Sequence, residues 1–357
     1  MKTIIIGMSG GVDSAVAAYL LQKKGYNVEA IFMKNWEDNT KYCHSEEDYI
    51  DALQVCNKLN IPLRTVNFSK EYWENVFEHF LSEYKSGRTP NPDILCNTKI
   101  KFKEFLNYAI ELGAHKIATG HYVQTKLINK KIKMYKGLDT NKDQSYFLYG
   151  LNQNQIKKTI FPLGGLNKLE VRNYAKKLEF SNYNKKDSTG ICFIGKRNFK
   201  EFLKEYIPAN PGDITTSNNE KLGIHEGLMY YTLGQRKGLG IGGSKDKLQS
   251  PWYVISKDLK NNRLVVSQGH NNKDLYKTSL EGSNINWISG QEPLNKRLNA
   301  KIRYRMNDNP CKITEITNSK IKVKFEKPQF AIAPGQSIVF YNQDECLGGA
   351  IIDKTFN

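Results

Sequence analysis

Residues 4–14 read Ile4-Ile5-Ile6-Gly7-Met8-Ser9-Gly10-Gly11-Val12-Asp13-Ser14, and this stretch decides the fold. The apolar run predicts a strand, the glycines predict a tight turn, and a helix follows that Asp13 or Ser14 would cap. Such a junction directs free backbone N–H groups and the positive end of the helix dipole at one point, which suits a phosphate group. Gly10 and Gly11 are expected there because side chains would hold the backbone away from the anion.

The spacing of this motif excludes two well-known phosphate loops. The chain has neither the lysine of the Walker loop at this point nor the G-x-G-x-x-G pattern of a dinucleotide site. Ser9 to Ser14 instead resembles the pyrophosphate loop of ATP pyrophosphatases, which split ATP into AMP and pyrophosphate to activate a carbonyl oxygen. The alternative is a strand-turn-helix corner with a purely structural role.

The segments that follow predict a doubly wound α/β fold. Strands are expected at 28–33, at 62–68 and in a segment that ends at Gly120, with helices between them. This order predicts right-handed parallel crossovers and a nucleotide at the carboxyl ends of the strands. Met33 stands at such an end, where it could hold an adenine or belong to the core.

Changes of pattern predict three domains. We expect a catalytic pyrophosphate-loop domain over residues 1–208, a small β-rich central domain over 209–274 and a C-terminal β-barrel over 275–357. In the last domain, the segments 301–306 and 321–325 alternate apolar and basic residues. Each would present one cationic face, which could lie against a phosphate backbone or simply be solvated.

The charge balance favours an anionic partner. The chain holds 53 Lys and Arg against 36 Asp and Glu, a formal charge of +17, and nucleic acid is the first partner to consider. Only nine of these bases are arginine, so a base-composition bias of the genome could explain part of the lysine excess. No apolar run approaches the roughly 20 residues of a membrane span, and the loop begins too near Met1 for a signal peptide; we expect a cytoplasmic protein with no membrane partner.

Two of the six cysteines stand in unusual loops. The absence of any C-x-x-C pair argues against a zinc ribbon or an iron–sulfur cluster. Cys96 follows the proline-rich segment 87–95 and is predicted to stand directly before a helix with Lys99 and Lys101 behind it, which favours a thiolate; burial is the alternative. Cys192 lies between glycines and basic pairs. Two such residues suggest a redox pair, although the sequence does not show that they meet.

A further segment, 142–147, sets charged and amide side chains beside aromatic ones. That combination suits phosphates and bases, and a solvated turn would explain it equally well.

Six motifs occur in one order along the chain. They are the pyrophosphate loop and the segments 90–97, 118–122, 142–148, 187–195 and 232–238. Together they resemble the bacterial tRNA-specific 2-thiouridylases over essentially the whole chain. The resemblance implies that ATP is held by Gly7, Met8, Ser9, Gly10, Gly11, Val12, Asp13, Ser14, Met33 and Gly120. It implies tRNA contacts at Asn91, Pro92, Asp93, His121, Lys142, Asp143, Gln144, Arg303, Tyr304 and Gln336.

The resemblance also implies the reaction, 2-thiolation of the wobble uridine of tRNAs for Lys, Glu and Gln. ATP would adenylate the C2 oxygen of the base, and a persulfide on Cys192, charged by an external sulfur carrier protein, would supply sulfur. Cys96 would be the nucleophile that leaves a Cys96–Cys192 disulfide. Asp93 is the candidate for proton transfer. Mg²⁺ is expected with the nucleotide, and no residue is assigned to a metal site.

Two rival interpretations remain open at this stage. An amide-forming synthetase could use the same loop and would not need two reactive cysteines. An RNA-binding module could keep a nucleotide pocket as a structural element and would release no pyrophosphate.

Overall fold

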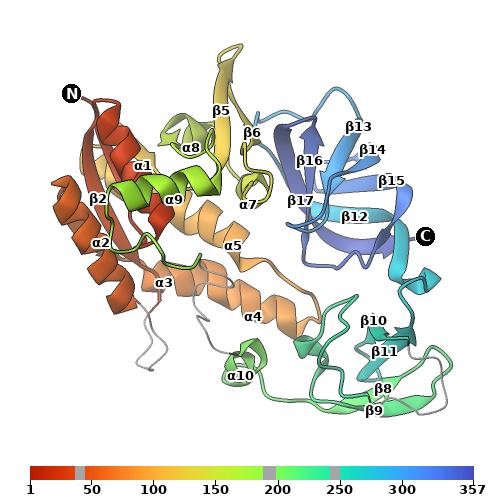
Figure 1. The fold of residues 1–357 in the computed structure, drawn as a ribbon. Coiled ribbons are helices and arrows are strands. Elements are labelled where there is room, and N and C mark those ends of the chain that lie inside the picture. Colours follow the sequence, from red (N-terminus) through yellow and green to blue (C-terminus); the bar gives the residue numbers. More distant parts are fainter. Residues whose placement is uncertain (37–44, 188–197, 242–249) are drawn as a thin grey trace.

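The protein forms a parallel α/β domain followed by two β domains (Figure 1). The structure is a computed structural model, and it describes residues 1–36, 45–187, 198–241 and 250–357. In Figure 1 the α/β domain lies at the left, the C-terminal barrel at the upper right and the central domain below it. This confirms the predicted fold class.

The α/β domain is built on a parallel sheet with the strand order β3-β2-β1-β4-β7. Its members all run in the same direction, and Ile5 of β1 pairs with Glu29 on one side and with Ile117 on the other. The strands are β1 (Thr3–Gly7), β2 (Asn27–Lys34), β3 (Leu63–Asn67), β4 (Lys116–Ala118) and β7 (Thr159–Ile160).

Helices cover both faces of this sheet. One face carries α1 (Val12–Lys23), α2 (Ser45–Leu59) and α9 (Lys168–Lys177). The other carries α3 (Ser69–Tyr72), η1 (Trp73–Phe77), α4 (Glu78–Lys85), α5 (Pro92–Leu95), η2 (Cys96–Glu104) and α6 (Phe105–Glu111). Two short helices follow, α7 (Ser145–Leu148) and α8 (Gln153–Lys157).

The alternation of side chains along β1 explains why both faces are covered. Ile4 and Ile6 belong to the core under α1, α2 and α9, whereas Ile5 belongs to the core on the other face. A strand whose successive residues are all apolar must be buried on both sides. The second core continues into both β domains, through Val266 of the central domain and Tyr341 of the barrel.

The C-terminal domain is a closed antiparallel barrel. Its strands are β12 (Tyr276–Trp287), β13 (Arg297–Lys301), β14 (Asn309–Ile316), β15 (Lys320–Phe330), β16 (Ser337–Asn342) and β17 (Glu345–Phe356), preceded by η4 (Lys273–Leu275). Pairing of β12 with both β15 and β17 closes the ring. The hairpin β5 (Val123–Ile128) and β6 (Lys131–Lys136), from the first half of the chain, pairs with β17 and so ties the α/β domain to the barrel.

One predicted barrel strand is confirmed and another is wrong. In β15, Ile321, Val323 and Phe325 are buried while the intervening lysines are exposed, as expected. The strand predicted over 301–306 ends at Lys301, however, and Lys301 is itself buried, 3.5 Å from the carboxylate of Asp143. This segment therefore has no continuous cationic face.

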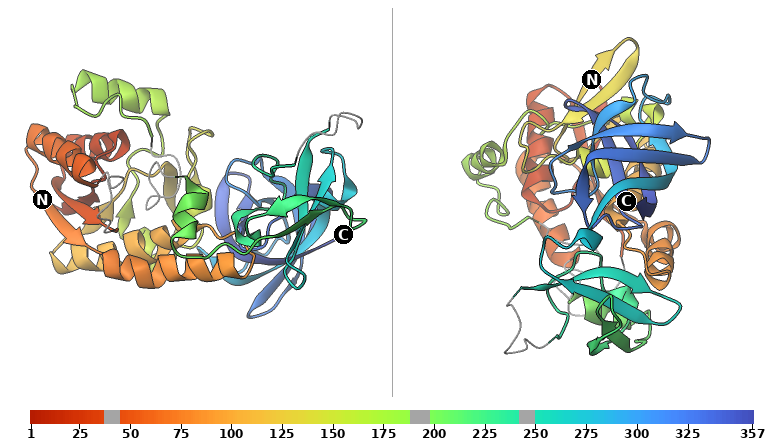
Figure 2. Two further views of the ribbon diagram at one scale, coloured as in Figure 1. Left: turned by 90° about the horizontal axis from the view of Figure 1, so that it is seen from below. Right: turned by 90° about the vertical axis from the view of Figure 1, so that its right-hand side faces the viewer.

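The central domain is a small sheet with the order β10-β11-β8-β9. Its elements are α10 (Phe199–Lys204), β8 (Gly212–Thr215), β9 (Lys221–His225), η3 (Leu228–Tyr230), β10 (Trp252–Asp258) and β11 (Arg263–Gln268). In the right-hand view of Figure 2 the central domain lies below the barrel, at the opposite end of the picture from the N-terminus.

Candidate active site

The carboxyl ends of β1 and β4 form the switch point of the parallel sheet. β2 and β3 continue from one side of this pair and β7 from the other. Open α/β sheets bind ligands in the crevice at such a point. The predicted pyrophosphate loop leaves β1 there, and Gly120 follows β4, so both lie where the fold favours a nucleotide.

The residues predicted to bind ATP lie close together, with Gly7 next to Met33 and Gly120 next to Ser14. A Cβ added to Gly7 would lie 3.0 Å from Cε of Met33, and one added to Gly120 would lie 2.9 Å from the backbone nitrogen of Ser14. Met33 therefore packs on the start of the loop, and Gly120 packs on the start of α1. The structure places the loop, Met33 and Gly120 in one region.

The two central glycines of the loop differ in what they require. Gly10 has a φ of +73°, and a Cβ there would lie 2.2 Å from the carbonyl oxygen of Asp48. Gly11 has a φ of −89°, and the nearest atom to its added Cβ is Oγ of Ser9 at 3.4 Å. The fold itself therefore demands glycine at position 10 but not at position 11.

The prediction that Asp13 or Ser14 caps the helix is wrong. Gly11 is the N-cap, which places Asp13 and Ser14 inside the first turn of α1. The Ser14 hydroxyl instead donates to the Gly11 carbonyl oxygen (3.0 Å) and accepts from the backbone N–H of Ser9 (3.2 Å). It closes the turn rather than capping the helix.

Side chains from residues 182–185 fasten Gly10 from outside the loop. Nδ2 of the buried Asn182 donates to the Gly10 carbonyl oxygen at 3.0 Å, and Nζ of Lys185 lies 3.4 Å from the same oxygen. Lys185 also binds Asp48 (2.6 Å) and Asp51. Burial works to lower the pKa of Lys185, but these carboxylates raise it above its ordinary value, so the side chain stays charged.

Asp13 belongs to a second network, which leads away from the loop. Both of its carboxylate oxygens accept hydrogen bonds from Nζ of Lys168, at 2.7 and 2.8 Å, and one also accepts from the hydroxyl of Tyr122 at 2.7 Å. Burial and the neighbouring Asp13 raise the pKa of Tyr122, which therefore stays protonated as the donor.

Asp187 is the other end of this network. Its Oδ1 lies 2.7 Å from Nζ of Lys168 and 3.2 Å from Nη2 of Arg172, and its Oδ2 pairs with Lys142. Burial works to raise the pKa of Asp187, but the hydrogen bonds from Lys142 and Lys168 hold it below its ordinary value. Lys168 thus links the pyrophosphate loop to residue 187 and to the segment predicted to contact tRNA.

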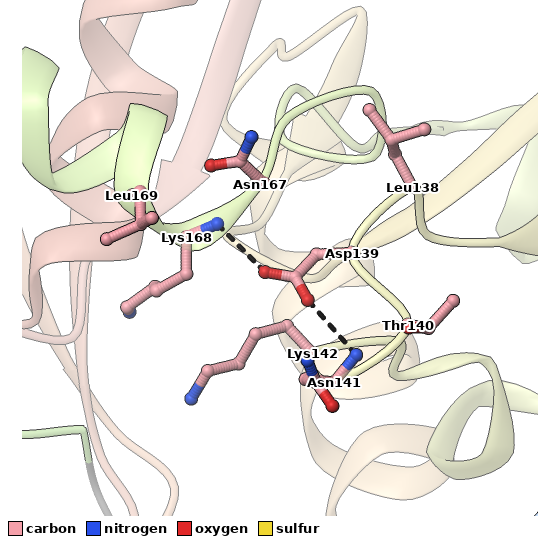
Figure 3. A pocket seen from close by; sticks show the side chains of 8 residues that line it. All are labelled: Leu138, Asp139, Thr140, Asn141, Lys142, Asn167, Lys168 and Leu169. Atoms are coloured by element: carbon pink, nitrogen blue, oxygen red, sulfur yellow. Dashed lines mark hydrogen bonds between the residues drawn. The ribbon is translucent and has the colours of Figure 1, made fainter.

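A cavity of about 440 Å³ lies beside Lys142 and Lys168, lined also by Asp139 and the start of α9. The side chains of Lys142 and Lys168 extend from it in the same direction (Figure 3). Asp139 shapes its wall by accepting hydrogen bonds from the backbone N–H groups of Lys168 (2.9 Å) and Asn141 (3.0 Å). The two lysines at the edge of this cavity are held in ion pairs with Asp13 and Asp187, so the cavity borders the network that leads to the candidate ATP site.

The predicted persulfide residue cannot be placed in this geometry. Asp187 is the last described residue before 188–197, and Cys192 lies outside the described residues. The predicted pairing of Cys192 with Cys96 falls outside them as well.

The helix that carries Cys96 begins earlier than predicted. It starts at Pro92, with Asn91 as the N-cap, whose side chain accepts from the Asp93 N–H at 3.2 Å. Cys96 therefore lies inside the helix, where α5 continues into η2, and is buried. An asparagine cap followed by proline is a recognised helix start, so Asn91-Pro92 was the signal that sequence reasoning missed.

Asp93 lies where its carboxyl group is hard to ionise. Burial raises the pKa of Asp93, and the positive charge of Lys101 partly opposes this. Burial and the same Lys101 lower the pKa of His121, whose Nδ1 lies 2.8 Å from Oγ1 of Thr119, so the imidazole is neutral. Asp93, Lys101 and His121 thus interact electrostatically in one region next to Cys96.

Several residues predicted to contact tRNA have internal partners. The buried Asp143 accepts from the N–H of Gly137 (3.1 Å) and of Ser145 (3.0 Å), and Oε1 of Gln144 accepts from the N–H of Tyr122 (3.0 Å). These bonds shape the loop before α7. A tRNA contact at Asp143, Gln144 or the buried His121 stays a prediction.

The predicted tRNA contacts of the barrel lie at its junction with the rest of the chain. Nη2 of Arg303 donates to the carbonyl oxygens of Leu233 (3.0 Å) and Ala331 (2.7 Å). Tyr304 packs on Phe147, with 4.3 Å between ring centroids. Nε2 of Gln336 donates to the carbonyl oxygen of Thr89 at 2.7 Å.

Sequence reasoning missed the residues that hold the loop. They are Tyr122, Lys168, Asn182 and Lys185. Tyr122 ends the motif 118–122 but was assigned no role there, and Lys168, which simply follows a helix cap, stands in no pattern that distinguishes it from a surface residue. Their roles depend on contacts over more than 100 positions in sequence.

Within the described ranges, no group of three or more His, Cys, Asp or Glu side chains is arranged to hold a metal ion. The helices of the same ranges include none with the length and apolar character that crossing a bilayer requires.

Comparison with known proteins gives consistent matches along the chain. Family models match residues 2–196 (tRNA methyl transferase HUP domain), 200–268 (tRNA methyl transferase PRC-barrel domain) and 277–352 (aminomethyltransferase beta-barrel domain). The tRNA-specific 2-thiouridylase MnmA of Proteus mirabilis is 56% identical over 99% of this chain and 97% of its own. The chain belongs to the tRNA-specific 2-thiouridylase family.

Another member of the tRNA-specific 2-thiouridylase family, from Francisella tularensis subsp. holarctica, is 54% identical over 98% of this chain and 99% of its own. Among solved structures, NMN synthetase from Francisella tularensis is 23% identical over 56% of this chain and 71% of its own, with a TM-score of 0.35. The two family models that match residues 2–268 are named for tRNA methyl transfer, whereas the relatives that match along nearly the whole chain are named 2-thiouridylases. Membership of this family makes the chain an enzyme, a tRNA sulfurtransferase.

Proposed function

We propose that this enzyme performs the ATP-dependent 2-thiolation of the wobble uridine in tRNAs for Lys, Glu and Gln. The observation that carries the proposal is the placement of the Gly7–Ser14 loop at the switch point of the sheet in a chain that belongs to the 2-thiouridylase family. A helix with Asp93 and Cys96 lies in the same α/β domain. The rival readings, an amide-forming synthetase and an RNA-binding module, have no such family match.

In the first step, ATP would bind with its phosphates at the loop and α1 and its adenine near Met33. The C2 oxygen of uridine would attack the α-phosphate, and pyrophosphate would leave. This converts a poor leaving group into AMP. The uridine would leave the anticodon stack to reach the site, which is less costly in a single-stranded loop than in a duplex.

In the second step, sulfur would replace the adenylated oxygen. The terminal sulfur of a Cys192 persulfide would form a bond to C2, and the C2–O bond to AMP would break. The Cys96 thiolate would then attack the Cys192 sulfur, so that the S–S bond to the transferred atom breaks and 2-thiouridine is released. The resulting Cys96–Cys192 disulfide would be reduced by an external thiol, and a sulfur carrier protein would restore the persulfide.

Asp93 is the residue we propose for proton transfer. Its raised pKa brings the carboxyl group closer to neutral pH, where acid–base catalysis is most effective. The neutral His121 nearby would leave Asp93 without a competing positive charge from the imidazole.

Mg²⁺ would enter with the nucleotide. Magnesium usually keeps several waters and binds through substrate phosphates and one or two carboxylates. Asp13 fits this limited role, since it is a carboxylate in the first turn of α1. Lys168, which donates to both carboxylate oxygens of Asp13, would have to release one of them. Bound Mg²⁺ would neutralise phosphate charge. The remaining roles fall to the chain: the glycines admit the phosphates, and Asn182 and Lys185 hold the loop.

The direct test is mass spectrometry of nucleosides from purified, unmodified tRNA for Glu after incubation with the protein, ATP, a thiol reductant and a sulfur carrier protein that bears a persulfide. We expect 2-thiouridine at the wobble position, with pyrophosphate released only when tRNA is present. The same tRNA with cytidine at that position serves as the control. Absence of 2-thiouridine, or full activity of both C96S and C192S, would contradict the proposal. We expect the reaction to take place in the cytoplasm.

A further inference from the structure

Residues 86–91, which we call the strap, connect α4 to the helix that carries Asp93 and Cys96. The sequence predicted a long irregular loop here, and such loops need to be held by other parts of a protein. The structure shows that both β domains hold it.

The central domain holds the strap at Gly87 and Thr89. Nζ of Lys257, on β10, donates to the Gly87 carbonyl oxygen at 2.9 Å. Gly87 has a φ of +72°, and a Cβ there would lie 2.7 Å from Cδ2 of Leu259, so the strap packs closely on the segment that follows β10. The hydroxyl groups of Thr89 and Thr232 are 3.2 Å apart.

The barrel holds the strap from the other side. The N–H of Thr89 donates to the carbonyl oxygen of Pro334 at 2.9 Å, and Nε2 of Gln336 donates to the carbonyl oxygen of Thr89 at 2.7 Å. A Cβ added to Gly335 would lie 2.9 Å from the backbone nitrogen of Thr89. Thr89 is therefore fixed through its backbone N–H, its carbonyl group and its hydroxyl group.

The strap leads directly into the candidate active site. Its last residue, Asn91, caps α5 by accepting from the N–H of Asp93, and Cys96 follows along the same helix. A displacement of the strap would therefore move the start of the helix that carries both Asp93 and Cys96.

Lys257 is unusual among the residues that contact the strap because its ammonium group lies in a cavity. It lies in a cavity of about 610 Å³ lined by the strap, the central domain and the barrel, and the other charged side chains that line it are Arg88, Asp274 and Lys277. Arg88 is paired with Glu83. Burial lowers the pKa of Lys257 to about 8. An ammonium group kept there is costly, and residues that cost stability are commonly retained for function.

We infer that Lys257 is a positioning residue, which fixes the strap through Gly87 and thereby sets Asp93 and Cys96 for sulfur transfer. The inference rests on the proposed function and extends it to the central domain. It assigns that domain a part in catalysis, although none of its described residues is among those placed at the nucleotide site above.

The experiment compares K257M, K257R and the control K260M in the full-length protein. Lys260 is exposed in the turn that follows β10, so K260M removes a positive charge close in sequence without removing a contact with the strap. Hydrogen–deuterium exchange of the amides from 87 to 96 reports on the strap itself. The rate of 2-thiouridine formation, the KM for ATP and the Tm report on function, nucleotide binding and folding.

For K257M we expect exchange of these amides to rise about tenfold and kcat to fall about tenfold or more, because small misplacements of reacting groups are costly. The KM for ATP and the Tm at pH 7 should stay at the wild-type value, as in K260M. K257R should restore kcat. As pH rises through about 8, Lys257 loses its charge, so the kcat of the wild type should fall relative to that of K257R.

Unchanged exchange in K257M, or an equal loss of kcat in K260M, would overturn the inference. A fall in the Tm of K257M together with a raised KM for ATP would also overturn it, since this would show a general structural role. Failure of the wild type to form 2-thiouridine would contradict the proposed function, while the exchange data would still decide whether Lys257 fixes the strap.

Discussion

Nδ2 of Asn182 donates a hydrogen bond of 3.0 Å to the carbonyl oxygen of Gly10, across 172 positions of sequence. Gly10 is the residue of the pyrophosphate loop that has a left-handed backbone conformation, and this bond fixes its carbonyl group within the loop. Replacing Asn182 by Leu should raise the KM for ATP about tenfold and destabilise the fold by about 1–3 kcal/mol, because the buried Gly10 carbonyl loses its shorter hydrogen bond and keeps only the 3.4 Å bond from Lys185. N184A, at an exposed position nearby, is the control and should change neither. ATP titration and urea unfolding measure both effects, and a wild-type KM in N182L would refute the role of this bond.

The two loop glycines allow the fold and the phosphate contact to be separated. G10A should lower the free energy of unfolding by more than about 1 kcal/mol, because alanine disfavours the left-handed region and its Cβ would meet the Asp48 carbonyl. G11A should cost less than G10A, since the φ of Gly11 is ordinary and its Cβ has room, and the remaining loss reflects the poorer N-cap that alanine makes.

Both variants should nevertheless lose pyrophosphate release if the loop binds phosphates, because a methyl group at either position meets the anion. Full activity of G11A would show that phosphates do not approach the loop there. A Tm loss as large in G11A as in G10A would contradict the geometric assignment.

Asp187 should make stability depend on pH. Its folded-state pKa is held below the ordinary value, so its contribution is present above the unfolded-state pKa near 3.8 and is lost as pH falls through the folded-state pKa. D187N should therefore destabilise the protein at pH 7 by about 1.5–3 kcal/mol, the range for hydrogen bonds to charged groups. The difference from the wild type should shrink as pH falls below 4. Urea unfolding at pH 7, 5 and 3.5 tests this, and a difference independent of pH would contradict it.

Asp93 provides a test of the proton-transfer step. D93N keeps the shape of the side chain and the N-cap of the helix, so the Tm and the KM for ATP should stay close to wild type. The single-turnover rate of 2-thiouridine formation should fall about 10²–10⁴-fold, as expected for a lost acid–base group. E111Q, at the exposed end of α6 in the same domain, is the comparison for charge removal outside the reaction. If D93N and E111Q lose the same activity, Asp93 has no special role.

The fold was predictable because its patterns are local. The continuous apolar run Ile4-Ile5-Ile6 marked a strand buried on both faces, and the alternation in 321–325 marked a strand buried on one face. The error at 301–306 has a physical cause. Lys301 pairs with a buried carboxylate and packs over Tyr341, so a basic residue that looked solvated belongs to the interior.

The candidate site was predictable only in part. The loop, Met33 and Gly120 follow from motif and strand order, whereas the supports of the loop depend on tertiary contacts. Lys168 reaches Asp13 from 155 positions away, and no local pattern marks such a pairing. The same limit applies to the strap, whose supports Lys257 and Gln336 come from two other domains.

The measurement closest to the central claim is a single turnover of persulfide-loaded protein with ATP and unmodified tRNA, followed by mass spectrometry of both products. The proposal predicts one Cys96–Cys192 disulfide for each 2-thiouridine formed, and none in C96S. C311A should behave as wild type, because burial raises the pKa of the Cys311 thiol to about 12 and keeps it unreactive. Formation of 2-thiouridine in full yield without that disulfide would contradict the account.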